Sequence, residues 1–133
     1  SKAAAKEFAA VGSWDGARAT FAATQAKNSQ EGTILATWRH LLDNGSLQIN
    51  EPNLAGTARK NLARVSAKFA NDLGVKNGDL VTISTDRGSL ALPVEVSEIL
   101  DGVIWLPRNG VGAESLRILG ALNGDGVKVR KGI

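Results

Sequence analysis

The chain has 133 residues, enough for one domain with a substantial core, and its formal net charge is +3 at pH 7. It contains no cysteine, which excludes a disulfide framework, a cysteine-ligated zinc site and an iron–sulfur cluster held by this chain alone, and which fits a reducing compartment. Membrane insertion and nucleic-acid binding are not expected, because no apolar run approaches the roughly 18 residues of a membrane span, no signal peptide opens the chain, and the cations are scattered.

Residues 1–32 differ in composition from the rest of the chain. Residues 1–30 hold ten alanines and three aromatic residues (Phe8, Trp14 and Phe21), but few aliphatic ones. Asp15-Gly16 is a hairpin-turn signal. We therefore predict a loosely ordered N-terminal segment over 1–32, with a hairpin around 12–21, followed by a domain over 33–133.

Residues 33–43 have the spacing of a helix that ends at Asn44-Gly45. The apolar residues that share one face of this predicted helix are Ile34, Leu35, Trp38, Leu41 and Leu42. His40, the only histidine, falls on the opposite face. We therefore predict a solvated surface histidine that is neither a metal ligand nor a general base.

The next segments predict an irregular connection and a second helix. Residues 48–60 contain Pro52 and Gly56 and predict an irregular connection. Ser66 is then expected to cap a short helix that ends at Gly74 and buries its apolar face. The apolar residues of that face are Phe69, Ala70 and Leu73. Asn77-Gly78 predicts a tight turn with positive φ.

The rest of the chain is dominated by short strands. Residues 80–85 form the first predicted strand, with Val81 and Ile83 on one face, and apolar residues alternate from Leu90 to Val96 in the second. Pro93 lacks an N–H and is expected at an edge or an irregular position. Residues 103–106 are almost continuously apolar and predict a strand buried on both sides. Val127 to Arg130 alternates again, as a last strand.

Many short strands joined by turns, with two modest helices, indicate a mostly β fold that closes, or nearly closes, into a small barrel. Helices do not alternate with strands, so the pattern of a doubly wound parallel sheet is missing. Phosphate-binding motifs of the Walker or Rossmann type and a Ser–His–Asp constellation are missing as well. Asp79, Asp86 and Asp101 stand in predicted turns, where aspartate caps the backbone, and are not expected to bind a metal.

Three motifs resemble the dinucleotide-binding module of the molybdopterin oxidoreductase superfamily. Residues 73–79 are similar to its signature Leu-Gly-Ile-x-(Asp/Asn)-Gly-Asp. Residues 66–70 stand where that superfamily has a capped helix, and Arg87-Gly88 is similar to its hairpin turn. The resemblance implies a double-psi β-barrel of the molybdopterin dinucleotide-binding type.

Other segments resemble one branch of that superfamily, the C-terminal region of the large iron–sulfur (G) subunit of bacterial, particularly actinobacterial, NADH-quinone oxidoreductase. These segments are residues 12–18, 37–43, 51–59, 84–88 and 105–109. The resemblance implies a structural domain of a cytoplasmic peripheral arm, in contact with other domains of the same polypeptide and with other complex I subunits. The parent protein would be an oxidoreductase with iron–sulfur clusters. This chain alone would bind no cofactor and have no turnover, because its molybdopterin scaffold would be vestigial.

The alternative is a working module that holds molybdopterin guanine dinucleotide in a molybdenum or tungsten enzyme similar to formate dehydrogenase. In that superfamily, residues at the places of Thr57 and Arg59 line the pterin cleft. The loop after Pro107 could present backbone donors and an amide side chain to a nucleotide. The loop residues concerned are Arg108, Asn109, Gly110 and Gly112. The plainer interpretations are a solvated arginine and a glycine loop that closes the barrel. The loop is shorter than in the active enzymes, which favours the structural role.

Overall fold

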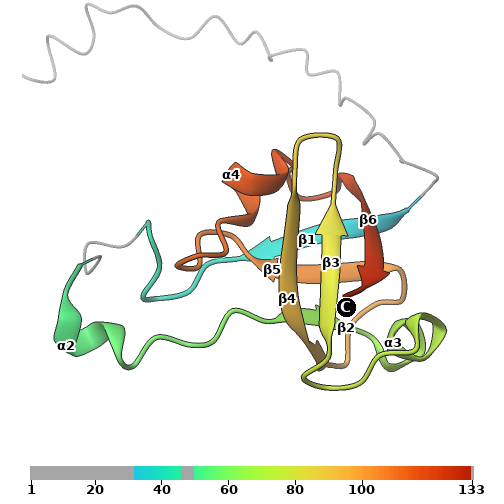
Figure 1. Cartoon of the computed structure of the whole chain (residues 1–133), viewed down its shortest axis with the longest axis horizontal. Helices are drawn as coiled ribbons and strands as arrows, with labels where there is room; N and C mark the ends of the chain where they lie inside the picture. The colour runs from blue at the N-terminus through green and yellow to red at the C-terminus, as the bar shows by residue number, and fades with distance from the viewer. Residues whose placement is uncertain (1–31, 46–49, 133) are drawn as a thin grey trace, which may run out of the picture.

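A computed structural model describes residues 32–45 and 50–132, in which six strands form a closed barrel (Figure 1). The predicted fold class is therefore confirmed, while the hairpin predicted around 12–21 lies outside the described residues. The strand order around the barrel is β1-β5-β2-β4-β3-β6. The strands are β1 Thr33–Trp38, β2 Ala63–Val65, β3 Leu80–Ser84, β4 Ser89–Val96, β5 Val103–Pro107 and β6 Gly126–Lys131. The helices of the described residues are α2 Pro52–Ala55, α3 Ala67–Leu73 and α4 Ser115–Leu119.

The helix predicted over residues 33–43 is wrong, because this segment begins with strand β1 and continues without regular structure. β1 pairs in parallel with β5, from Ile34 opposite Val103 to Trp38 opposite Pro107, and antiparallel with β6. Leu35 is fully buried inside the barrel, whereas Ile34 points outward and is 42% exposed. Both faces of β1 are thus apolar, which hides the alternation typical of a half-buried strand.

The β3–β4 hairpin forms as predicted, with Val81 opposite Leu92. Val81 and Ile83 are fully buried, and the alternating residues of β4 face the same core. Pro93 is the last residue of β4 that pairs with β3, and the ladder between β2 and β4 begins one residue later. Its missing N–H therefore falls at a boundary between two ladders, as expected for a proline in a sheet.

Helix α3 and the turn after it also match the prediction. The Ser66 hydroxyl accepts a hydrogen bond from the Phe69 N–H at 3.1 Å, and Gly74 ends the helix with a φ of 66°. Gly78 has a φ of 89°, which is the left-handed conformation that the Asn-Gly signal predicts. The Asp79 carboxylate accepts from the Lys76 N–H at 2.9 Å, so this aspartate closes the turn as expected.

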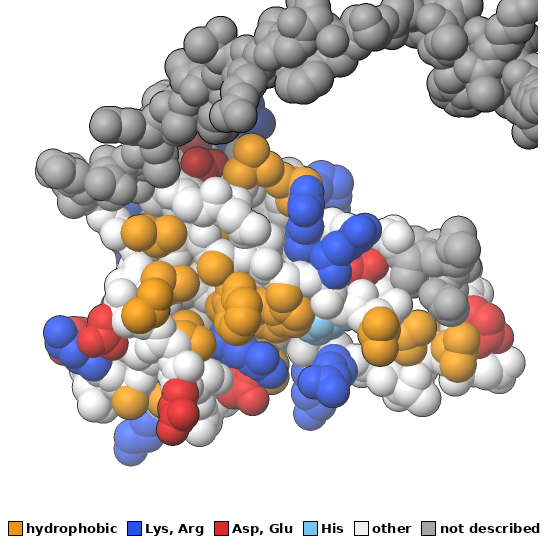
Figure 2. Space-filling view, turned by 180° about the vertical axis from the view of Figure 1, so that it is seen from behind, with side chains coloured by type: hydrophobic (Ala, Val, Ile, Leu, Met, Phe, Trp, Pro, Cys, Tyr) orange, Lys and Arg blue, Asp and Glu red, His pale blue; other side chains and the backbone are white. Residues whose placement is uncertain are grey.

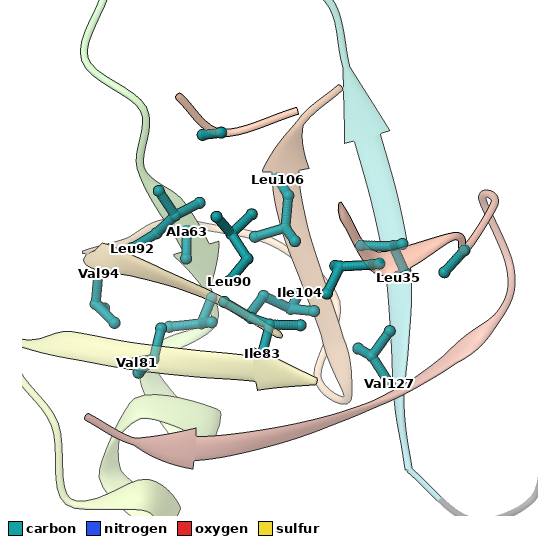
Figure 3. Packing of buried hydrophobic residues seen from close by; sticks show 14 of the residues in the cluster. Leu35, Ala63, Val81, Ile83, Leu90, Leu92, Val94, Ile104, Leu106 and Val127 are labelled. Carbon is teal, nitrogen blue, oxygen red and sulfur yellow. The ribbon is translucent and has the colours of Figure 1, made fainter. Parts of the chain in front are cut away.

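The core fills the barrel with aliphatic side chains that point toward one another from every strand (Figure 3). β5 contributes Ile104 and Leu106, both fully buried. Its other residues, Val103 and Trp105, are half-buried on the outside, so the prediction that this strand is buried on both sides is wrong. A small barrel has one inner face, and no further layer of the described chain covers the outer face of β5.

Candidate functional site

Three chain segments meet at the end of the barrel where β1 and β5 stop. The two strands are parallel, so the segments that follow them start side by side (Figure 1). The Arg108 N–H donates to the Trp38 carbonyl at 2.7 Å, and the Asn44 N–H donates to the Asn109 carbonyl at 2.9 Å. The Asn44 side-chain amide also donates to the Glu114 carboxylate, just before α4. Residues 39–45 and 108–114 therefore form one connected layer.

The third segment, residues 57–62, joins this layer through Asn61. The Asn61 side-chain amide donates to the Val111 carbonyl at 2.8 Å. A Cβ atom on Gly110 would lie only 2.0 Å from the Asn61 side-chain oxygen, so this position accepts glycine because Asn61 packs against it. Gly112, with a φ of 72°, completes a turn in which the Ala113 N–H donates to the Gly110 carbonyl at 2.8 Å. Both glycines have a structural reason in this turn.

The site residues predicted from the sequence are only partly brought together. The Thr57 hydroxyl donates to the Leu54 carbonyl at 2.8 Å and so caps the end of α2. Arg59 is exposed and lines two pockets next to β1. Arg108 is also exposed but lines a different pocket, together with Thr37 and Asn123. The structure therefore does not place the two arginines in one pocket.

Beside Arg59, the structure shows an aromatic and cationic site that the sequence did not predict. Two adjoining pockets of about 420 and 320 Å³ share His40 and Arg59, and each lies within the size range of small-ligand pockets. The larger pocket is lined by Trp38, His40, Arg59, Lys60, Leu62 and Arg64. The smaller is lined by His40, Leu41, Leu42, Thr57, Ala58 and Arg59. Aromatic and cationic side chains arranged around a pocket in this way could attract a planar or anionic group.

Trp38 is the centre of the aromatic contacts. Its ring centroid lies 5.6 Å from that of Trp105, edge to face, and 5.5 Å from that of His40. The Arg64 guanidinium lies 5.1 Å from the Trp38 ring and forms an ion pair with Glu95 at 2.6 Å. Figure 2 shows an apolar patch on this side of the molecule with the histidine at its border and basic side chains near it.

The prediction of a solvated histidine is wrong, because His40 is half-buried between the two pockets. Burial removes water from its ring and lowers the pKa of His40 below the usual value of 6.5. The cations Arg59 and Arg64 act in the same direction, whereas Asp43 opposes them. The site therefore favours the neutral form of His40, and the pKa of His40 reports on the charges around this site.

We expect the single histidine signal in a proton NMR titration to have its midpoint below 6.5. Arg59→Gln should move the midpoint upward because it removes one of the cations that lower the pKa, while Arg130→Gln on β6 should leave it unchanged. Because the folded-state pKa is lowered, His40 contributes stability that is present above pH 6.5 and lost as the pH falls through that pKa. A midpoint at or above 6.5 would contradict the half-buried position.

The loop residues predicted as nucleotide contacts are in contact with other segments of the described chain. Asn61 fills the space against Gly110, and the Arg108 N–H and the Asn109 carbonyl already form backbone hydrogen bonds. Within the residues that the structure describes, no group of three or more His, Cys, Asp or Glu side chains could hold a metal ion. Over the same residues, no helix has the length and apolar character to cross a bilayer.

Comparison with known proteins gives two kinds of match at the sequence level. The family described as Molydopterin dinucleotide binding domain matches residues 33–123. The G subunit of NADH-quinone oxidoreductase from Mycobacterium tuberculosis is 44% identical over 135 residues, which cover 98% of this chain and 17% of that protein. The corresponding protein of Streptomyces coelicolor is 37% identical over 127 residues, covering 92% of this chain and 15% of that protein. The chain thus spans about a sixth of the length of these relatives.

Solved structures show a similar fold. A computationally designed double-psi β-barrel protein has a TM-score of 0.53 with 22% sequence identity, over 75% of this chain and 95% of that chain. A rationally designed double-psi β-barrel protein has a TM-score of 0.52 with 21% identity, over 76% of this chain and 96% of that chain. At these identities the likeness concerns the fold, and it confirms the double-psi β-barrel predicted from the sequence.

Proposed function

This chain belongs to the Molydopterin dinucleotide binding domain family, and from its relatives we propose that it is a structural domain of the large iron–sulfur (G) subunit in an NADH-quinone oxidoreductase. In this proposal residues 33–133 form the barrel unit, residues 1–32 are the segment that precedes it, and the dinucleotide scaffold is vestigial. The domain belongs to the peripheral arm of the complex, on the cytoplasmic side of the membrane. Iron–sulfur clusters lie elsewhere in the parent oxidoreductase, and this chain alone has no turnover.

The relatives support the choice of parent protein. The G subunits of two actinobacterial genera are 37–44% identical to this chain over more than nine-tenths of its length, including most of the part before the family match. Identity of this kind over a whole stretch of chain fits a common position in a common assembly. Its partners in this proposal are other domains of the same polypeptide and other subunits of the peripheral arm.

The observation that carries the vestigial role is the position of Asn61. Its side chain contacts the glycine turn from the inside, with the amide on the Val111 carbonyl and the oxygen where a Gly110 side chain would lie. A loop that holds phosphate through its backbone needs donors directed at open space. Here Gly110 packs on Asn61 of a neighbouring segment and Gly112 takes a left-handed turn conformation, so each glycine has a role in this turn without a ligand.

The test is a titration of this chain with guanosine diphosphate, followed by the backbone amide signals. We expect no localised shifts at millimolar nucleotide, a concentration at which a binding free energy of about 4 kcal/mol would already be visible. The residues to watch are Thr57, Arg59, Arg108, Asn109, Gly110 and Gly112. Binding would need at least one of the two arginines to contact phosphate.

Saturable shifts at these residues that disappear in Arg59→Ala would contradict the vestigial role. They would favour the second candidate, a working module for molybdopterin guanine dinucleotide in an enzyme similar to formate dehydrogenase. Arg130→Ala serves as the control, because Arg130 is an exposed cation on β6 and lines neither of the Arg59 pockets. A similar weakening of the shifts in Arg59→Ala and in the control would indicate weak nonspecific attraction to the basic chain.

A further inference from the structure

The outer face of β1 and β5 is apolar where a barrel strand normally presents polar residues to water. In register, Ile34 lies opposite Val103 and Ala36 lies opposite Trp105. Ile34 is 42% exposed. Trp105 is half-buried, and among the described residues its one aromatic contact is with the Trp38 ring. A contiguous exposed patch of this kind marks an interaction site more often than it marks ordinary surface.

The apolar surface continues from Trp38 onto the segments beyond the barrel. Leu41 is 93% exposed. Helix α2 has no buried residue, and its leucine, Leu54, is 42% exposed. Figure 1 shows α2 standing away from the barrel at the end where β1 points. A helical turn that contributes nothing to the core gains little from folding by itself, so its apolar side chains need another contact. We define the aromatic–leucine surface as Trp38, Leu41, Leu42 and Trp105, which are joined by the ring contacts of Trp38 and by the pocket that His40 shares with the two leucines.

Cations that stand outside the ion pairs of the described chain border this surface. Arg59 and Lys60 line the pockets beside Trp38 and are exposed, and neither takes part in an ion pair among the residues that the structure describes. The ion pairs of those residues instead join Arg64 to Glu95, Lys68 to Asp101, and Arg117 to Glu114. Positive charge around an apolar centre is the pattern of an interface in which the partner carries carboxylates at the rim.

We propose that the aromatic–leucine surface docks an acidic polypeptide segment from another subunit of the same enzyme, with aliphatic or aromatic anchors flanked by aspartate or glutamate. The proposal rests on the function proposed above and names the chemistry of the partner. A second copy of this chain is a poorer occupant, because its own Arg59 and Lys60 would bring like charges to a surface that is already cationic. The anchors of the partner enter the two pockets that share His40 and Arg59.

The experiment uses the full parent polypeptide, tagged and expressed in its own bacterium, with the co-purified NADH-quinone oxidoreductase subunits quantified by mass spectrometry. We expect Leu41→Glu to lower their recovery about tenfold, since it places a carboxylate in the apolar centre. The matched control is Leu100→Glu, the same change at a leucine that is 78% exposed at the opposite end of β5. Leu41 makes so little internal contact that the thermal melt of the 133-residue chain should stay the same.

A second pair of variants tests the charge of the partner. Arg59→Glu combined with Lys60→Glu should also lower recovery about tenfold, and the loss should shrink in high salt. Lys128→Glu combined with Arg130→Glu changes two exposed cations of β6 by the same amount and should leave recovery unchanged. Equal losses in the test and control pairs would mean that net charge alone governs association, which would overturn an acidic partner at this surface.

The outcomes separate this inference from the function on which it rests. If the wild-type parent recovers no other subunit, the proposed function fails and the docking surface fails with it. If the wild type recovers the complex and Leu41→Glu recovers it equally, the function stands and the docking surface is wrong. Sedimentation of the 133-residue chain as a dimer, lost in Leu41→Glu, would assign the surface to a second copy and overturn the acidic partner.

Discussion

Leu106→Ala is expected to lower the free energy of unfolding by about 3–5 kcal/mol, the upper range for a leucine in a closed core. Leu106 has no solvent exposure and points from β5 into the middle of the barrel (Figure 3). Removing its side chain leaves a cavity that the closed ring of strands cannot collapse to fill, because each strand is held by two neighbours. Urea denaturation monitored by circular dichroism measures the change.

Trp105→Ala is the matched control, since it alters the preceding residue on the opposite face of the same strand. The Trp105 ring is half-buried and its aromatic contact is the edge of Trp38, so its removal should cost only about 1–2 kcal/mol. An equal or larger loss from Trp105→Ala would mean that the ring is enclosed within this chain. The outer face of β5 would then belong to the core, and the apolar face of β1 and β5 could not serve as an interface.

Gly78→Val is expected to lower the free energy of unfolding by about 2–3 kcal/mol. Gly78 has a φ of 89°, which a β-branched residue resists, and no other atom lies within 4 Å of the place that its Cβ would take. The cost would therefore come from the backbone and not from a clash. The Gly78 N–H also donates to the Val94 carbonyl at 2.9 Å, so the turn cannot change its φ without losing a contact with β4.

Gly56→Val separates the backbone effect from the general cost of replacing a glycine. Gly56 has a φ of −64°, in the ordinary helical region, and likewise has open space around its Cβ position. Valine there should cost less than about 1 kcal/mol. Thermal and urea unfolding of both variants give the comparison. Similar stabilities for the two would show that the left-handed conformation at Gly78 carries no cost, and the tight turn would have to be rejected.

The parts of the fold that depend on local chemistry could be predicted from the sequence. Ser66 and Gly74 mark the two ends of α3 through a side-chain cap and a left-handed residue, and both are visible in a window of a few residues. The β3–β4 hairpin was equally visible, because the large aliphatic residues on the inner face of β4 alternate with Ser89, Ala91, Pro93 and Glu95. The short elements β2, α2 and α4 were not predicted, since three to five residues carry too little pattern.

β1 was misassigned for a physical reason that also bears on its proposed role. Ile34 and Trp38 on its outer face are as apolar as Leu35 on its inner face, so the period of two disappeared and helical spacing remained. A strand whose two faces are apolar is buried on one side by its own barrel and is suited to burial by a partner on the other. The wrong helix prediction therefore arose at the strand whose outward-facing residues are apolar like its core residues.

The candidate site could be predicted only in pieces. Thr57, Arg59 and residues 108–112 were identified one by one, but the arrangement of their segments depends on the parallel pairing of β1 with β5, between residues far apart in the chain. The sequence around Asn61 and His40 did not indicate their positions in the site, because an asparagine in a loop and a histidine in an apolar run occur in many structural settings. Their roles follow from contacts that only the folded barrel creates.

The strand order also determines when the chain can fold during its synthesis. β1 is the first strand of the barrel to be made, yet its two neighbours, β5 and β6, are the last two. The β3–β4 hairpin can form as soon as both strands have left the ribosome, but β1 then has no partner. Long-range pairing of this kind makes folding slow. Leu35 therefore stays exposed to solvent until β6, which contains Val127, has been translated. The core of the barrel is completed by one of the last strand residues to be synthesised.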